Sequence, residues 1–239
     1  MKKHIPYHLL GHMDHGWLKA CHHFSFGRYI NRERRNFGAL LVVNDDTIAP
    51  KSGFPMHPHD NMEIITYVRS GAITHDDNNG GHGVTRAGDV QVMSAGYGIE
   101  HSEYNREDEI TTLYQIWIIP ARGDVAPRFD SRQFPQNHVT DTLPVLVSGQ
   151  EEHKDIYKNG DALYIHQDAA LYGGRVKAGK KISVTIKHQA YVLASKGVFT
   201  CDDITLNAGD ALEVTDEKTI TFTAQEDCEI VVIDVPSAP

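Results

Sequence analysis

The chain has 239 residues, 40% of them hydrophobic and 23% charged, which is enough apolar content for one large or two small domains. Its net charge of −9 excludes a general attraction to nucleic acids or to anionic membrane surfaces. Three widely spaced cysteines, no membrane-length apolar run, and polar residues where a signal peptide needs its apolar core favour a soluble, cytoplasmic protein with reduced cysteines. The sequence does not indicate the oligomeric state, and a monomer is the simplest expectation.

Short runs of β-branched and aromatic residues follow one another along the first half, a pattern typical of all-β sandwiches and barrels. Strands are expected over residues 39–43, 63–68, 89–93 and 112–119. The run Asn44–Asp46 is interpreted as a turn between strands, and Asp76–Gly81 predicts a hairpin loop with His75 and His82 at its exposed ends. Five aromatic residues are expected to pack in a core rather than contact a substrate: Trp17, Phe24, Phe26, Tyr29 and Phe37.

The second half repeats this style. Strands are expected over residues 163–166, 173–176, 182–186, 191–194, 197–201, 211–214, 219–223 and 230–235. The phrase Ala-Gly-Asp precedes a strand at both 87–89 and 208–210, which indicates a duplicated barrel. Prolines and weak periodicity place a linker at 126–139, so we predict one barrel over 1–125 and another over 140–239.

Two short pairs in the first half indicate a metal site, His57-Pro58-His59 and His101-Ser102-Glu103. Residues two apart on a β-strand point to the same face, so each pair can aim both side chains at one point. Three imidazoles and a carboxylate suit iron, copper, nickel, zinc or manganese, and leave positions open for a substrate and oxygen. We therefore interpret the site as catalytic. Glu63 and Asn105, each four residues after a histidine, fall on the same strand faces.

The surroundings of these pairs resemble known sequence motifs. Gly53…His57-x-His59-x3-Glu63…Gly71 resembles the first cupin motif, and Gly88…Gly96…His101-x3-Asn105 resembles the second. Ser25–Tyr29, Phe37–Leu40 and Asn44–Asp46, together with the two pairs, resemble the pirin family. Three further phrases are similar to the bacterial pirin-like quercetinases: Met62–Val68, Gly98–Asn105 and Leu113–Ile118.

The pirin resemblance implies an all-β bicupin whose N-terminal barrel holds iron(II) through His57, His59, His101 and Glu103. Zinc, copper, nickel, manganese and cobalt remain alternatives, because the same donors accept several metals. In many cupins the first-motif glutamate is itself a ligand. Here Glu103 is preferred, with Glu63 and Asn105 behind the ligands and Glu63 orienting a histidine N–H. The second half offers no ligand pair, so its barrel is expected to be metal-free.

The same resemblance implies a quercetin 2,3-dioxygenase, which opens the heterocyclic ring of a flavonol with O2 and releases carbon monoxide. The expected partners are a flavonol or another phenolic and O2, with no direct binding of nucleic acid or membrane. Glu103 is a candidate base for the substrate hydroxyl. Two alternatives stay open: an iron-dependent regulator that binds a protein partner, and a cupin enzyme of another reaction type.

Overall fold

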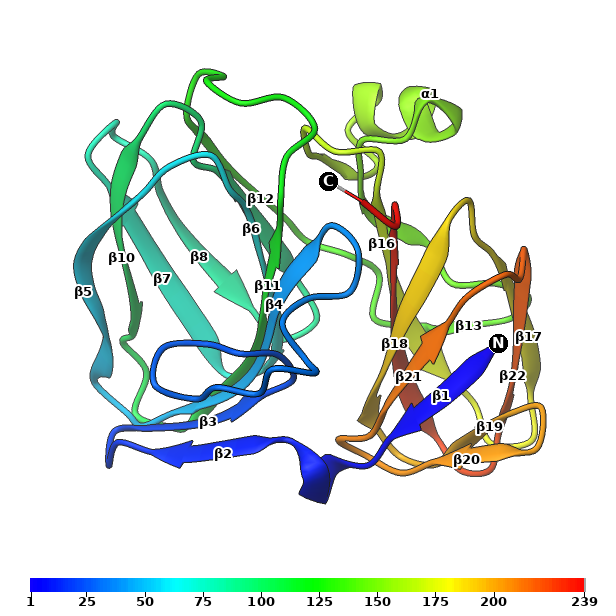
Figure 1. Ribbon diagram of the computed structural model, residues 1–239. Coiled ribbons are helices and arrows are strands. Elements are labelled where there is room, and N and C mark those ends of the chain that lie inside the picture. The colour runs from blue at the N-terminus through cyan, green and yellow to red at the C-terminus, as the bar shows by residue number, and fades with distance from the viewer. Residues whose placement is uncertain (239) are drawn as a thin grey trace. The chain divides into compact units, whose positions relative to one another are not determined.

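The computed structural model describes residues 1–238, which divide into two compact, strand-rich units (Figure 1). The N-terminal barrel comprises Gly11–Pro135 and Leu163–Gln167, and the C-terminal barrel comprises Met1–Leu10, Gln136–Ala162 and Asp168–Ala238. The all-β, two-barrel fold predicted from the sequence is confirmed. Among the described residues, no helix has the length and apolar character needed to cross a membrane.

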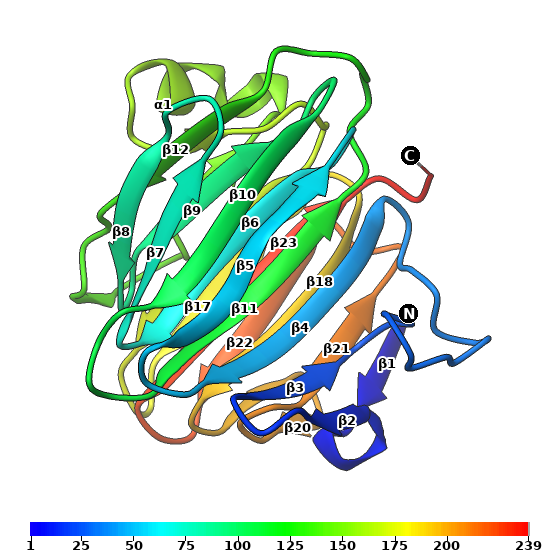
Figure 2. The same ribbon diagram turned by 90° about the vertical axis from the view of Figure 1, so that its left-hand side faces the viewer.

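The N-terminal barrel consists of two antiparallel sheets (Figure 2). Its sheet strands are β2 (Gly11–Asp14), β3 (Leu18–His22), β4 (Leu40–Ile48), β5 (Ser52–His59), β6 (Glu63–Ser70), β7 (Ala72–Asp77), β8 (His82–Arg86), β9 (Val90–Ser94), β10 (Ile99–Asn105), β11 (Thr111–Ile118) and β12 (Arg128–Arg132). This unit also contains β15 (Leu163–Tyr164), which belongs to neither of the two sheets. The order is β12-β9-β6-β11-β4-β3-β2 in one sheet and β5-β10-β7-β8 in the other.

The interior of this barrel is apolar in one part and polar in another. A buried cluster of Leu18, Ile48, Val68, Ile73 and Leu113 packs with Trp17 and Phe54 at its edge. The same strands then present polar residues on the same face, because side chains two apart share a face. Along β4, for example, the buried Asn44 and Asp46 precede the buried Ile48.

Two local predictions in this barrel are wrong. Asn44–Asp46 is not a turn but lies inside β4, where the three residues pair with β3 and β11. Strand pairing on both sides overrides the weak β-propensity of Asn and Asp. His75 is fully buried on β7, whereas His82, at the start of β8, is exposed as expected.

The C-terminal barrel also has two sheets, with orders β1-β21-β18-β23-β16-β14 and β17-β22-β19-β20. Its elements are β1 (Lys2–Ile5), η1 (Tyr7–Leu9), β13 (His138–Val139), β14 (Val145–Ser148), η2 (Glu151–His153), α1 (Lys154–Lys158), β16 (Ala170–Val176), β17 (Lys181–Thr185), β18 (Gln189–Lys196), β19 (Phe199–Cys201), β20 (Ile204–Leu206), β21 (Ala211–Val214), β22 (Thr219–Ala224) and β23 (Cys228–Val235). A continuous apolar core fills it, including Val192, Phe222 and Val232.

The boundaries between the units differ from the expected division at 126–139. Strand β1 pairs with β21, with Lys2 opposite Val214 and Ile5 opposite Ala211, so the first ten residues belong to the C-terminal barrel. Strand β12, inside the expected linker, pairs with β9 of the N-terminal barrel. In both cases the backbone N–H and C=O groups of an edge strand are paired with a segment far away in the sequence. Local sequence patterns do not reveal such pairings.

Candidate metal centre

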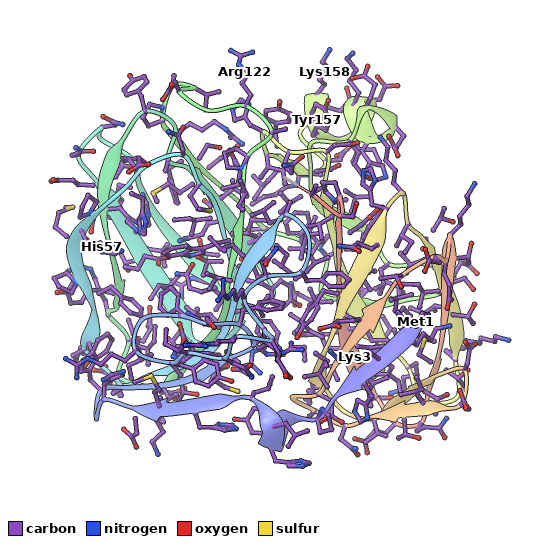
Figure 3. All side chains as sticks on the ribbon, in the orientation of Figure 1. Met1, Lys3, His57, Arg122, Tyr157 and Lys158 are labelled. Carbon is purple, nitrogen blue, oxygen red and sulfur yellow. The ribbon has the colours of Figure 1, made fainter. Side chains whose placement is uncertain are left out.

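Three histidines from two paired strands meet on one wall of the N-terminal barrel. His57 and His59 lie on β5, and His101 lies opposite His57 on the antiparallel strand β10; Figure 3 shows His57 on β5. One ligand nitrogen from each ring lies within 4.8 Å of the other two. Two donors at about 2.1 Å from one ion are at most about 4.2 Å apart, so small rotations of the imidazoles would bring the three nitrogens to bonding distance.

Hydrogen bonds fix which nitrogen of His57 is free. Its Nδ1 lies 2.7 Å from the backbone carbonyl oxygen of Pro55. A carbonyl only accepts, so Nδ1 carries the proton and Nε2 keeps its lone pair. This is the arrangement that metal-binding histidines normally show.

A longer chain of contacts acts on His101. Asp77 Oδ2 lies 2.9 Å from His75 Nε2, and His75 Nδ1 lies 3.4 Å from His101 Nδ1. An ionised carboxylate only accepts, so His75 donates from Nε2, accepts at Nδ1, and leaves His101 to donate from Nδ1. The lone pair of His101 is then on Nε2, a buried atom with no hydrogen-bond partner among the described residues. That unpartnered nitrogen fits a metal ion.

The pKa of Asp77 supports the same proton positions along the contacts from Asp77 through His75 to His101. Burial alone would raise the pKa of Asp77, but hydrogen bonds from His75 and from the backbone N–H groups of Gly81 and Asn79 lower it below its usual value. Asp77 is therefore ionised at neutral pH. His75 itself is held in place by Phe129, whose ring stacks on it at a centroid distance of 3.9 Å and an interplanar angle of 2°.

His59 and His101 are neutral at physiological pH. Burial, and then the neighbouring His57, lowers the pKa of His59 to about 4. Burial and the surrounding histidines lower the pKa of His101 to about 2. Neutral imidazoles are the form that binds metals.

Glu103 lies on the same strand but apart from this cluster. The pairing of β10 with β5 slips between His101 and Glu103, which stand opposite His57 and Phe54 respectively. The Glu103 carboxylate is fully buried and accepts hydrogen bonds from Gln91 Nε2 at 2.7 Å, Thr66 Oγ1 at 3.1 Å and Gln115 Nε2. Burial raises its pKa to about 7, against the opposing effect of these donors.

The two residues expected behind the ligands have other partners. Glu63 Oε2 accepts a hydrogen bond from Ser94 Oγ at 2.7 Å, and burial raises the pKa of Glu63 to about 7. Asn105 Nδ2 donates to three backbone carbonyl oxygens, those of Ile48, Ala49 and Glu109. Orientation of the histidines comes instead from Pro55 and from His75, which the sequence reasoning missed. The period-two pair His75 and Asp77, just before the loop, was the available signal.

A cavity of about 580 Å³ adjoins the histidines inside the barrel, and Glu103 also lines it. Aromatic rings form its apolar side: Trp117 meets His59 edge-on at 4.9 Å and Phe26 at 5.4 Å between centroids. Phe26 therefore lines the cavity, whereas the sequence analysis expected it to pack in a core. The volume suits a small organic molecule.

Comparison with known proteins agrees with this architecture. The Pirin family model matches residues 5–118, and a model described as the quercetinase C-terminal cupin domain matches residues 156–235. A pirin-like protein of Caulobacter vibrioides is 48% identical over 231 residues, 96% of this chain and 97% of that protein. A quercetin 2,3-dioxygenase of Escherichia coli is 35% identical over 229 residues, 95% of each. The crystal structure of the bacterial pirin YhhW of Escherichia coli with nickel(II) has a TM-score of 0.89 and 35% identity over 99% of both chains.

Proposed function

The chain belongs to the pirin family, and we propose that it is a metal-dependent dioxygenase that opens the ring of quercetin or a related flavonol with O2 and releases carbon monoxide. The observation that carries this proposal is the cluster of three histidines beside an aromatic-walled cavity of about 580 Å³. The name quercetin 2,3-dioxygenase of the 35% identical Escherichia coli protein supports it.

We propose that His57, His59 and His101 hold one divalent ion, His57 and His101 through Nε2, with Glu103 as the fourth ligand and iron(II) as the metal. The nickel(II) complex of the 35% identical protein YhhW supports the binding of a divalent ion by this chain. Glu103 follows His101 by two residues and lines the same cavity, and a bound cation favours its ionised form. When bound, the ion supplies Lewis acidity and access to O2 chemistry.

The chain's own residues then have separable tasks in this proposal. Phe26 and Trp117 bind the flat rings of the substrate and exclude water from that side of the cavity. Gln91, Thr66 and Gln115 fix the carboxylate of Glu103. Burial raises the pKa of Glu103 to about 7 without a metal, and the bound ion would favour its ionised form, in which it can accept the proton of a substrate hydroxyl.

Metal analysis combined with oxygen uptake tests this function. Protein loaded anaerobically with iron(II) should bind one equivalent, and should then consume O2 and release carbon monoxide with quercetin. His101→Ala should lose both metal and turnover, whereas His82→Ala, an exposed histidine on the same sheet, should change neither.

Glu103→Gln should keep the shape of the site and lose most of the turnover. Full turnover by that variant with metal bound would exclude Glu103 as the base. An iron-loaded wild type that binds quercetin without consuming O2 would refute the dioxygenase and favour the regulatory alternative.

A further inference from the structure

We propose that Asp46 and Gln115 form a hydroxyl-binding subsite that makes the cavity selective for flavonols with adjacent hydroxyl groups on one aromatic ring. Both side chains line the cavity, and both carry a buried oxygen, Asp46 Oδ1 and Gln115 Oε1, with no hydrogen-bond partner among the described residues. The inference rests on the proposed function, because it assumes a phenolic substrate in that cavity.

Strand pairing places the two oxygens near one another. On antiparallel β4 and β11, Asp46 stands opposite Leu113 and Gln115 stands opposite Asn44, so Asp46 and Gln115 are diagonal neighbours. Diagonal neighbours on one face lie about 7–8 Å apart at their Cα atoms. Asp46 shares the inward face of β4 with Asn44, while Asp45 and Thr47 point outward. Both oxygens are thus presented to the same part of the cavity.

The orientation of Gln115 is fixed by its neighbour. Its Nε2 donates to the carboxylate of Glu103, which directs Oε1 away from that carboxylate as an acceptor without a donor. A buried acceptor without a partner destabilises a protein. A ligand that brings an O–H group removes that cost, so the cavity favours hydrogen-bond donors at this point.

Asp46 is buried, with 2% of its surface exposed, and the charge of Arg69 opposes the effect of that burial on its pKa. Burial, and then the charges of Asp45 and Glu103, raises the pKa of Asp46 well above its usual range. The ion pair of Arg69 is made with Asp45. In its protonated form, which burial favours, the Asp46 carboxyl group can both donate and accept a hydrogen bond. Such a group matches a phenolic hydroxyl and gives no preference for an anionic ligand.

Binding without turnover tests this subsite. Three flavonols with two, one and no hydroxyl groups on the B ring (quercetin, kaempferol and galangin) are titrated into zinc-loaded protein by calorimetry. The wild type should bind quercetin about tenfold more tightly than galangin, as expected for one or two hydrogen bonds to otherwise unpartnered groups. Asp46→Leu and Gln115→Met should each bring the two affinities to within about threefold.

Matched variants control for folding and for general effects. Thr47→Val changes the neighbouring outward side chain of β4 and should keep the tenfold preference. If Asp46→Leu does not fold, Asp46→Asn replaces it in the test. Asn keeps the shape of the side chain and one acceptor oxygen, so this variant should keep part of the preference for quercetin. An unchanged preference for quercetin in Asp46→Leu would overturn the subsite, and if that variant does not fold, so would an unchanged preference in Gln115→Met. A wild type that binds all three flavonols equally, or binds none of them, would overturn it as well. Oxygen uptake by the iron-loaded wild type tests the proposed function separately.

Discussion

Replacing Asp77 by Asn should weaken metal binding although Asp77 does not touch the three clustered histidines. The backbone N–H groups of Asn79 and Gly81 donate to Asp77 Oδ1, each at 2.8 Å. In the variant these two donors select the amide oxygen for that position, so the NH2 group must face His75 Nε2. His75 is then forced to accept at Nε2 and to carry its proton on Nδ1.

The reversed proton reaches the metal site through one further contact. A protonated His75 Nδ1 faces His101 Nδ1 across 3.4 Å, so His101 must accept there and carry its own proton on Nε2. That proton occupies the nitrogen otherwise left free for the metal. Changes to groups that orient a metal-binding histidine cost about 10-fold to 100-fold in affinity, which corresponds to about 1.4–2.8 kcal/mol. We expect a loss in this range for Asp77→Asn.

Competition with a chromophoric chelator for zinc(II) at pH 7 measures this loss directly. The matched control is His82→Gln, which breaks the 2.6 Å contact between His82 and Asp76 at the same hairpin without touching the buried chain. Proton-detected nitrogen spectra of the metal-free protein should show the proton of His101 on Nδ1 in the wild type and on Nε2 in Asp77→Asn. Equal zinc affinities for the wild type and Asp77→Asn would refute the proton chain.

Three further outcomes are expected. Asn105→Ala removes hydrogen bonds to three backbone carbonyls and should lower the free energy of unfolding in urea by about 1–3 kcal/mol, with metal stoichiometry unchanged. Gly53→Ala would place a Cβ 2.2 Å from the carbonyl oxygen of Glu103; it should push β5 from β10, lower the melting temperature and weaken zinc binding together. Burial lowers the pKa of His23 from 6.5 to about 3. The contribution of neutral His23 to the free energy of unfolding is therefore complete above pH 6.5. It is lost as the pH falls towards 3, by up to about 1.4 kcal/mol per pH unit. His23→Phe should show a correspondingly shallower loss of stability over that range in denaturant titrations.

The part of the site that follows from strand periodicity could be predicted from the sequence. His57 and His59 are two apart on one strand, and His101 needs only to face them from the next. The slip in pairing between His101 and Glu103 has no local signature, so the separation of Glu103 from the histidine cluster could not be foreseen. His75 was missed because a histidine beside a strong turn signal is usually exposed. Here it lies on a strand paired on both sides, and the ring of Phe129 stacks on it.

The fold was predictable at the level of barrels and less so at their boundaries. Alternating apolar residues with intervening turns are sufficient to indicate an all-β chain. The pairing of β1 with β21 joins residues more than two hundred positions apart, and no local pattern encodes it. Asn44 and Asp46 have a low β-propensity, yet strands on both sides hold them in β4. Tertiary pairing outweighs propensity at such positions.

The inward positions of the two barrels differ in their polar content. In the C-terminal barrel these positions on β22 and β23 are Ile220, Phe222, Ile230 and Val232, which pack into a continuous core. In the N-terminal barrel the inward positions of β4, β10 and β11 include Asp46, His101 and Gln115, each with one buried polar atom that has no hydrogen-bond partner among residues 1–238. Each such atom costs about 1–3 kcal/mol when it is buried alone. An ion on His101, and a hydroxyl ligand on Asp46 and Gln115, would each remove part of this cost. The atoms that lower the stability of the barrel would therefore favour the binding of both.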